Sequence, residues 1–235
     1  MKDEDFWNSI EATEEEKKKG TYYLRERGLE EHFHVLDYLE SFKKNGEEKI
    51  SYSEIASVLR YDKRIRRCLF KYIGVVEERL RAYFMDHFRD DFESLVQTRT
   101  FNMVYEDQGK DLYKAISHLD FGRLVGLFKK QQDLFKKAVF GDVECLRDNL
   151  DALVRLRNQV CHNKFLLNNL EFKLCHYQGT KSSSLWANIR NLWLLSDSNC
   201  KESLVKEMHT CAQSGSSKYK NQVEWRLPEH VKLSL

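Results

Sequence analysis

The sequence predicts an all-α protein, and three observations support this prediction. The 235 residues include a single proline, Pro228, and ten scattered glycines, so little interrupts long helices. Apolar residues recur at steps of three and four along much of the chain, which is the spacing of one face of an α-helix. Forty-one per cent of the residues are hydrophobic and 32% are charged, a balance typical of chains that fold outside a membrane.

The N-terminal half divides into a charged start and three helical segments. Residues 1–20 contain the block EEEKKKG and predict a solvated leader or a frayed helix. A helix is expected over 29–44, where apolar residues stand at helical spacing: Leu29, Phe33, Leu36, Leu39 and Phe42. Ser51 and Glu54 have capping-box spacing, which predicts the start of a short helix.

A longer helix is expected to begin at Asp62, a favourable N-cap, and to run to about Phe88. Its apolar stripe comprises Ile65, Leu69, Tyr72, Val76, Leu80, Tyr83 and His87. A looser stretch is predicted at 90–109. Helical pieces should follow at 111–119 and 122–141, separated near Asp120.

The sequence 143–162 predicts another helix, which Asn163 is expected to end in the left-handed conformation. Apolar segments flank a turn at 179–184, and 212–221 has the composition of a mobile loop. We therefore expect a leader at 1–20, one helical domain at 21–211 and a loop with a C-terminal segment at 212–235.

No metal or other cofactor is predicted. The six cysteines show no C-x-x-C pairing, and neither Cys161-His162 nor Cys175-His176 has the ligand spacing of a structural zinc site. His32 and His34 project from different sides of a helix. Phosphate-binding loops, nucleophile elbows and H-E-x-x-H motifs are missing from the sequence, which weakens assignment as an NTPase, a hydrolase or a metalloprotease.

The chain is expected to be cytoplasmic and to lie outside membranes. Its start lacks the apolar core of a signal peptide, and the sequence has no run of about 18 apolar residues. The net charge of +2 and pI of about 8.1 are too mild to indicate nucleic acid binding by themselves. Evidence for a polyanionic partner must therefore be local.

Arg157 interrupts an otherwise apolar helix face. A turn of about 100° per residue places it near the centre of an arc with Leu146, Leu150, Leu153, Val154, Val160 and Cys161. The charged and polar residues, Gln159 among them, fall on the opposite side. A guanidinium that faces the core is costly unless it is paired or enters a wet cleft, because it cannot lose its charge.

Asn158 and His162 are one turn apart, whereas Arg157 lies about 140° around the helix from His162. The three side chains converge if Arg157 reaches around the helix, if the helix bends, or if two such helices meet in a dimer. Such a trio suits metal-independent RNA cleavage, with His162 as general acid or base, Arg157 on the phosphate and Asn158 as an orienting group. The alternative is that Arg157 forms a buried ion pair or a dimer contact and that His162 caps the helix.

The motif RNQVCH resembles the Arg-x(4-6)-His signature of HEPN-superfamily ribonucleases, in which Asn often follows the Arg. Three segments are similar, in the expected order, to the Abi-like (abortive infection) proteins of that superfamily: 60–88, DFGRLVGLFKK at 120–130 and LRNQVCHNKFLLNN at 156–169. The resemblance spans about half of the chain. It implies an HEPN-like helical bundle with additional helices, a homodimer, and a site formed by Arg157, Asn158 and His162.

Basic residues form two clusters, the first at 60–71 and the second at 128–137. From these clusters and the end of the 143–162 helix, we predict that these residues contact RNA: Lys63, Arg64, Arg67, Lys129, Lys130 and Lys164. The alternative for the first cluster is a solvated helix face balanced by Glu77 and Glu78. Phe128 and Phe135, interleaved with the second cluster, are expected in the core rather than under bases.

The resemblance implies a metal-independent endoribonuclease of a phage-defence system, a toxin that cleaves RNA by 2′-hydroxyl attack in a composite dimeric site. One alternative is a non-catalytic HEPN-fold regulatory protein that binds a small RNA. A helical interaction protein, in which Arg157 pairs across a subunit interface, is the other.

Overall fold

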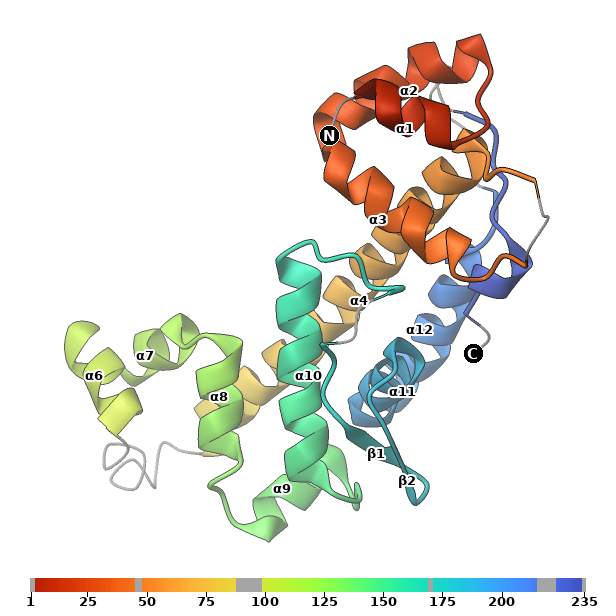
Figure 1. The fold of residues 1–235 in the computed structure, drawn as a ribbon. Coiled ribbons are helices and arrows are strands. Elements are labelled where there is room, and N and C mark those ends of the chain that lie inside the picture. The colour runs from red at the N-terminus through yellow and green to blue at the C-terminus, as the bar shows by residue number, and fades with distance from the viewer. Residues whose placement is uncertain (1–2, 45–47, 88–98, 169–170, 215–222, 234–235) are drawn as a thin grey trace. The chain divides into compact units, whose positions relative to one another are not determined.

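The computed structural model describes residues 3–44, 48–87, 99–168, 171–214 and 223–233, and helices dominate it (Figure 1). The predicted all-α class is confirmed. Within the described residues the β-structure is a two-stranded antiparallel hairpin, β1 (Cys175–Tyr177) with β2 (Thr180–Ser182), and an isolated bridge. No helix in the described ranges combines the length and the apolarity needed to cross a membrane.

The chain divides into two compact units. The first comprises 1–67, 165–169 and 205–235, and the second comprises 68–164 and 170–204. These units do not coincide with the boundaries predicted after residues 20 and 211. Helix α4 (Tyr52–His87) contributes residues to both units, as does α12 (Ser198–Cys211).

The first unit begins with three helices, α1 (Asp3–Ser9), α2 (Glu14–Arg27) and α3 (Leu29–Glu40). The structure thus has two helices in the region expected to be a solvated leader or a frayed helix. A Thr13–Glu16 capping box starts α2, and Phe6 of α1 is fully buried. Gly20 is required in α2, since a Cβ there would lie 2.6 Å from side-chain atoms of Trp7 and Tyr52. A short 3-10 turn, η1 (Glu229–Val231), lies near the C-terminal end.

Helix α4 is continuous over 36 residues, so the prediction of two helices separated at Asp62 is wrong. The capping box at its start is confirmed, because the Ser51 N–H donates to Glu54 and the Glu54 N–H donates to Ser51 Oγ. No proline or glycine occurs between Ser51 and Ile73 to stop the helix. The predicted stripe is buried from Ile65 to Tyr83, and His87 at its end is exposed.

The second unit contains α6 (Arg99–Asp107), α7 (Leu112–His118), α8 (Phe121–Phe128), α9 (Asp133–Phe140), α10 (Leu146–Cys161) and α11 (Leu185–Leu195). Helix α6 replaces the later part of the predicted looser stretch, and residues 88–98 lie outside the described ranges, as do 215–222 of the predicted loop. The predicted helical piece at 122–141 is divided into α8 and α9. Helix α10 begins three residues later than expected and packs against α8, β1 and α11.

Asp62 is buried inside α4 rather than exposed at a helix start. Its Oδ1 accepts a hydrogen bond from the Leu166 N–H at 2.7 Å, and its Oδ2 lies 3.3 Å from Arg66 Nε. Burial raises the pKa of Asp62 to about 6, although Arg66 and the backbone N–H groups of Leu166 and Leu167 act in the opposite direction. The carboxyl group therefore holds its proton to a higher pH in the folded chain than in the unfolded chain.

This linkage predicts a pH-dependent loss of stability that Asp62→Asn removes. The contribution of Asp62 to the free energy of unfolding is fully present below about pH 4. It falls by about 3 kcal/mol in total as the pH rises through the pKa that Asp62 has in the folded chain. Asparagine keeps the acceptor for Leu166 without the charge. Urea unfolding between pH 4 and 7 should show Asp62→Asn gaining stability relative to wild type as the pH rises, whereas exposed Asp37→Asn should follow wild type. Parallel curves for wild type and Asp62→Asn would contradict this assignment.

Candidate functional site

Helix α10 carries the predicted site, and its buried face is broader than the sequence indicates. Leu150, Leu153 and Val160 are buried as expected from their spacing, but Asn149, Leu156 and Gln159 are buried with them. This shifts the centre of the core face away from Arg157. The prediction that Arg157 faces the core is therefore wrong: its side chain lies at the border and is partly exposed.

A polar contact explains the burial of Gln159. Its Nε2 donates to Glu171 Oε2 at 2.9 Å, and Arg155 donates to the same carboxylate oxygen at 2.8 Å. Arg155 Nε also donates to the Glu171 carbonyl oxygen at 2.9 Å. Arg155 and Gln159, from the predicted polar side, thus bind α10 to the chain that follows it. Arg157 and Asn158 lie at the opposite border of the buried face.

Arg157, Asn158 and His162 lie in the last turns of α10, where Arg157 and Asn158 are partly exposed and His162 is exposed. Within the described residues, none of the three side chains has a hydrogen bond or an ion pair. The alternative of a buried ion pair inside the chain is thus not what the structure shows. Their donors and acceptors are available to a ligand or to a second copy of the chain.

His162 occupies the C-cap of α10, with its backbone N–H donating to the Asn158 carbonyl at 3.0 Å. Asn163 follows at φ +54°, so the predicted left-handed ending is confirmed. The Lys164 N–H then donates to the Gln159 carbonyl at 3.1 Å and completes the turn. His162 is therefore held at a defined helix end, although its ring faces solvent.

The basic residues predicted to contact RNA differ in their availability. In the second unit, Lys129 pairs with Asp151 at 2.6 Å, whereas Lys130 and Lys164 are exposed. Lys129 thus reaches α10 itself. Phe128 is fully buried and Phe135 is partly exposed, so the expectation of a core role holds for Phe128.

In the first unit, Arg64 has intramolecular partners. It donates to the carbonyl oxygens of Cys211 and Gln213, and its guanidinium lies 4.5 Å from the centre of the Trp225 ring. Lys63 is partly exposed, and its pKa is lowered by burial and by the nearby charges of Arg27 and Arg67. Arg67 is exposed.

The histidines considered for metal binding also have clear positions. His32 is buried, and its Nδ1 lies 3.0 Å from the Gly28 carbonyl. Burial lowers the pKa of His32, so the neutral form is favoured. His34 is exposed on the same helix. The two side chains do not converge on one point.

Sequence reasoning missed one group of reactive side chains at the other end of α10. Cys145 and Asp148 stand at its start, and His176 approaches them from β1. The C-x-x-D spacing places the first two residues on one face of a helix turn. No sequence pattern indicates the third residue, because His176 is far away along the chain and is brought close only by the packing of β1 on α10.

No family model matches this chain, and no curated protein or solved structure matches it. Membership of the Abi-like proteins therefore stays a prediction that depends on the motif residues themselves.

The left-handed residue after His162 predicts how the helix end responds to substitution. Asn163→Val should lower the free energy of unfolding by about 1–2 kcal/mol, because a β-branched residue is strained at this φ. Asn163→Gly should retain wild-type stability or exceed it slightly. Urea unfolding of the two variants tests this, and equal stability of the Val and Gly variants would show that the helix does not end in this conformation.

Proposed function

We propose that this protein is a metal-independent endoribonuclease that acts as a homodimer, and that it serves as the growth-arresting toxin of a bacterial phage-defence system. The observation that carries the proposal is the environment of Arg157. Its side chain is partly exposed and has no ion-pair partner among the described residues. Arg157 directly precedes Asn158 and lies on the same helix whose C-cap is His162. A cation held in this way at a helix border is suited to an anionic ligand. The phage-defence setting rests on the resemblance to Abi-like proteins.

The three side chains supply the functions that RNA cleavage needs. His162 in its neutral form accepts the proton of a ribose 2′-hydroxyl, and the 2′-oxygen attacks the adjacent phosphorus. The bond from phosphorus to the 5′-oxygen breaks, and the same imidazole, now protonated, donates its proton to that leaving oxygen. Arg157 stabilises the additional negative charge on the phosphoryl oxygens, and Asn158 orients the phosphate or the imidazole. The products are a 2′,3′-cyclic phosphate and a free 5′-hydroxyl, and no metal takes part.

A dimer explains how groups on different sides of one helix act together. Arg157 and His162 point in directions about 140° apart on α10, so one helix presents them separately. The border that carries Arg157 also includes Val154, Asn158 and Cys161, and all four are partly exposed. We infer that two copies of α10 meet along this border, so that Arg157 of one subunit approaches His162 of the other.

The proposal predicts cleavage that survives chelation and depends on His162. Wild-type protein incubated with labelled total and structured RNA in EDTA should produce fragments ending in 2′,3′-cyclic phosphate. His162→Ala and Arg157→Ala should each lower the rate by at least about 100-fold, in line with the loss of an acid-base group or a transition-state cation.

Matched controls separate catalysis from surface charge. His209→Ala removes an exposed histidine on α12, and Arg147→Ala removes an exposed arginine on α10. Both variants should cleave like wild type. Equal, salt-sensitive RNA binding by wild type and His162→Ala, with no cyclic ends from either, would instead favour a non-catalytic RNA-binding protein. Indifference to RNA, with loss of the dimer in Arg157→Ala, would favour a helical interaction protein.

A composite site predicts complementation between two inactive variants. When Arg157→Ala and His162→Ala proteins are unfolded together and refolded as a mixture, heterodimers contain one site with both residues intact. About one quarter of wild-type activity should return, because about half of the dimers are mixed and one of their two sites is complete. Each variant refolded alone should stay inactive. No recovery, with mixed dimers demonstrated by native mass spectrometry, would place the whole site within one subunit.

A further inference from the structure

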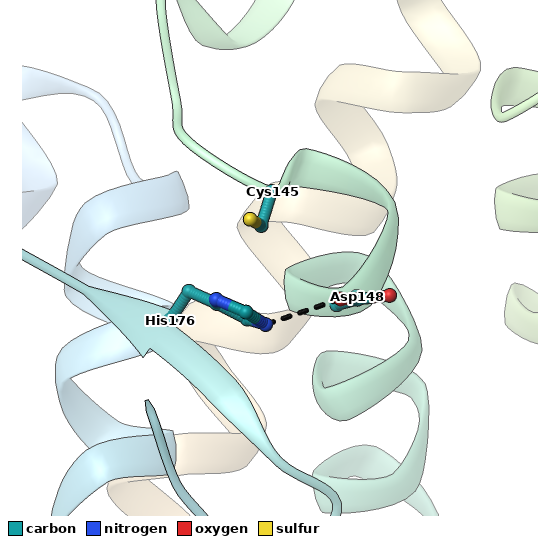
Figure 2. Close-up of side chains that lie close together, drawn as sticks. All are labelled: Cys145, Asp148 and His176. Atoms are coloured by element: carbon teal, nitrogen blue, oxygen red, sulfur yellow. Dashed lines mark ion pairs between the residues drawn. The ribbon is translucent and has the colours of Figure 1, made fainter. Parts of the chain in front are cut away.

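A cysteine, an aspartate and a histidine converge at the N-terminal end of α10 (Figure 2). The His176 Nε2 atom lies 3.1 Å from Asp148 Oδ2. One ligand atom from each of Cys145, Asp148 and His176 lies within 4.8 Å of the other two. All three residues belong to the second compact unit, so the cluster is formed within one packed body.

One buried amide holds both parts of this cluster in place. Asn149 Oδ1 accepts from the His176 N–H at 2.7 Å, and Asn149 Nδ2 donates to the His176 carbonyl oxygen at 3.1 Å. The same Nδ2 donates to the carbonyl oxygen of Glu144, the residue before Cys145, at 3.1 Å. The backbones that carry the thiol and the imidazole are therefore fixed to the same side chain before any ligand binds.

The backbone of Cys145 is unusual for a residue with a side chain. Its φ of 50° and ψ of 39° lie in the left-handed region, and its side chain makes no capping hydrogen bond to α10. A non-glycine residue is strained in this conformation, and such residues are enriched at functional sites. Capping therefore does not account for a cysteine at this position.

The arrangement fits a shared ion better than a nucleophilic triad. In a relay from thiol to imidazole to carboxylate, the sulfur and the carboxylate contact opposite nitrogens and lie on opposite sides of the ring. Here the sulfur and a carboxylate oxygen are within 4.8 Å of each other and of one ring nitrogen. Ligand atoms at about 2.0–2.3 Å from a tetrahedral Zn²⁺ ion are about 3.3–3.8 Å apart, which lies within this limit.

The cluster opens to solvent on one side. Cys145 and Asp148 line a cleft of about 600 Å³ formed by α9 and the chain from Gly141 to Asp148. The two lysines that line it, Lys136 and Lys137, are paired with Asp133 at 3.0 Å and with Asp142 at 2.6 Å. The cleft is also lined by one further cation, Arg147, and one further anion, Glu144, besides the cluster itself. The charges around the cluster therefore largely balance, and a water molecule can reach a bound ion from the cleft.

We propose that Cys145, Asp148 and His176 bind a transition-metal ion, Zn²⁺ in the first instance, with water as the fourth ligand. Thiolate, carboxylate and neutral imidazole together carry two negative charges, which offset the charge of the ion, and binding releases the thiol proton to solvent. The ion links the start of α10 to β1. This site stands apart from the proposed RNA-cleaving residues at the other end of the helix and does not depend on them.

The test is metal binding by the full-length chain, measured without any RNA. Metal-stripped protein is titrated with Zn²⁺ against a chromogenic chelator, and with Co²⁺ while the thiolate-to-cobalt charge-transfer absorption is recorded. Wild type should bind one ion per chain and show that absorption. Cys145→Ser should lose the absorption, and Cys145→Ser and His176→Gln should each weaken Zn²⁺ affinity by about tenfold or more.

Cys161→Ser is the matched control, because Cys161 is a partly exposed cysteine at the opposite end of the same helix. It should bind both ions like wild type. Cys145 is exposed, so Cys145→Ser decides the outcome even if His176→Gln fails to fold. Absence of Zn²⁺ binding by wild type, or equal binding by wild type and Cys145→Ser, would overturn the proposal whatever the result of the RNA assays.

Discussion

The second compact unit depends on the hydrogen bonds of one buried amide, that of Asn149. Its side chain forms hydrogen bonds with the backbones of Glu144 and His176. The backbone carbonyl oxygen of Asn149 accepts a hydrogen bond from Asn191 Nδ2 of α11 at 2.7 Å. Leaving any one of these buried groups without a partner costs about 1–3 kcal/mol. The loop before α10, strand β1 and helix α11 are therefore all held to α10 by a residue at its first turns.

This constraint sets the rotation of α10 about its own axis. Asn149 near one end and Gln159 near the other are both drawn inward by their partners, Gln159 through Glu171. Because both residues lie on the same side of the leucine row, the buried face turns toward them. Arg157 therefore lies at the border of that face and not at its middle, and its charge is in contact with water there.

The two ends of α10 are consequently suited to different ligands. The first turn holds Asp148 and presents Cys145 beside His176, a set of soft and anionic donors that matches a transition-metal cation. The last turns hold Arg157, Asn158 and His162, a set of donors and a proton carrier that matches a phosphate. The acidic Asp148 in the first turn also agrees with the direction of the helix dipole.

The sequence by itself determined the helical class, most helix positions, the capping box at Ser51 and the left-handed ending at Asn163, because these follow from local periodicity and backbone preferences. It also singled out Arg157 as the unusual residue of its helix. Tertiary structure alone decided that α4 continues past Asp62, that residues 3–27 fold, and that His176 meets Cys145 and Asp148. These outcomes depend on burial and on partners far apart in the chain, such as Leu166 for Asp62 and Glu171 for Gln159, and a helical pattern read along one segment contains no information about such partners.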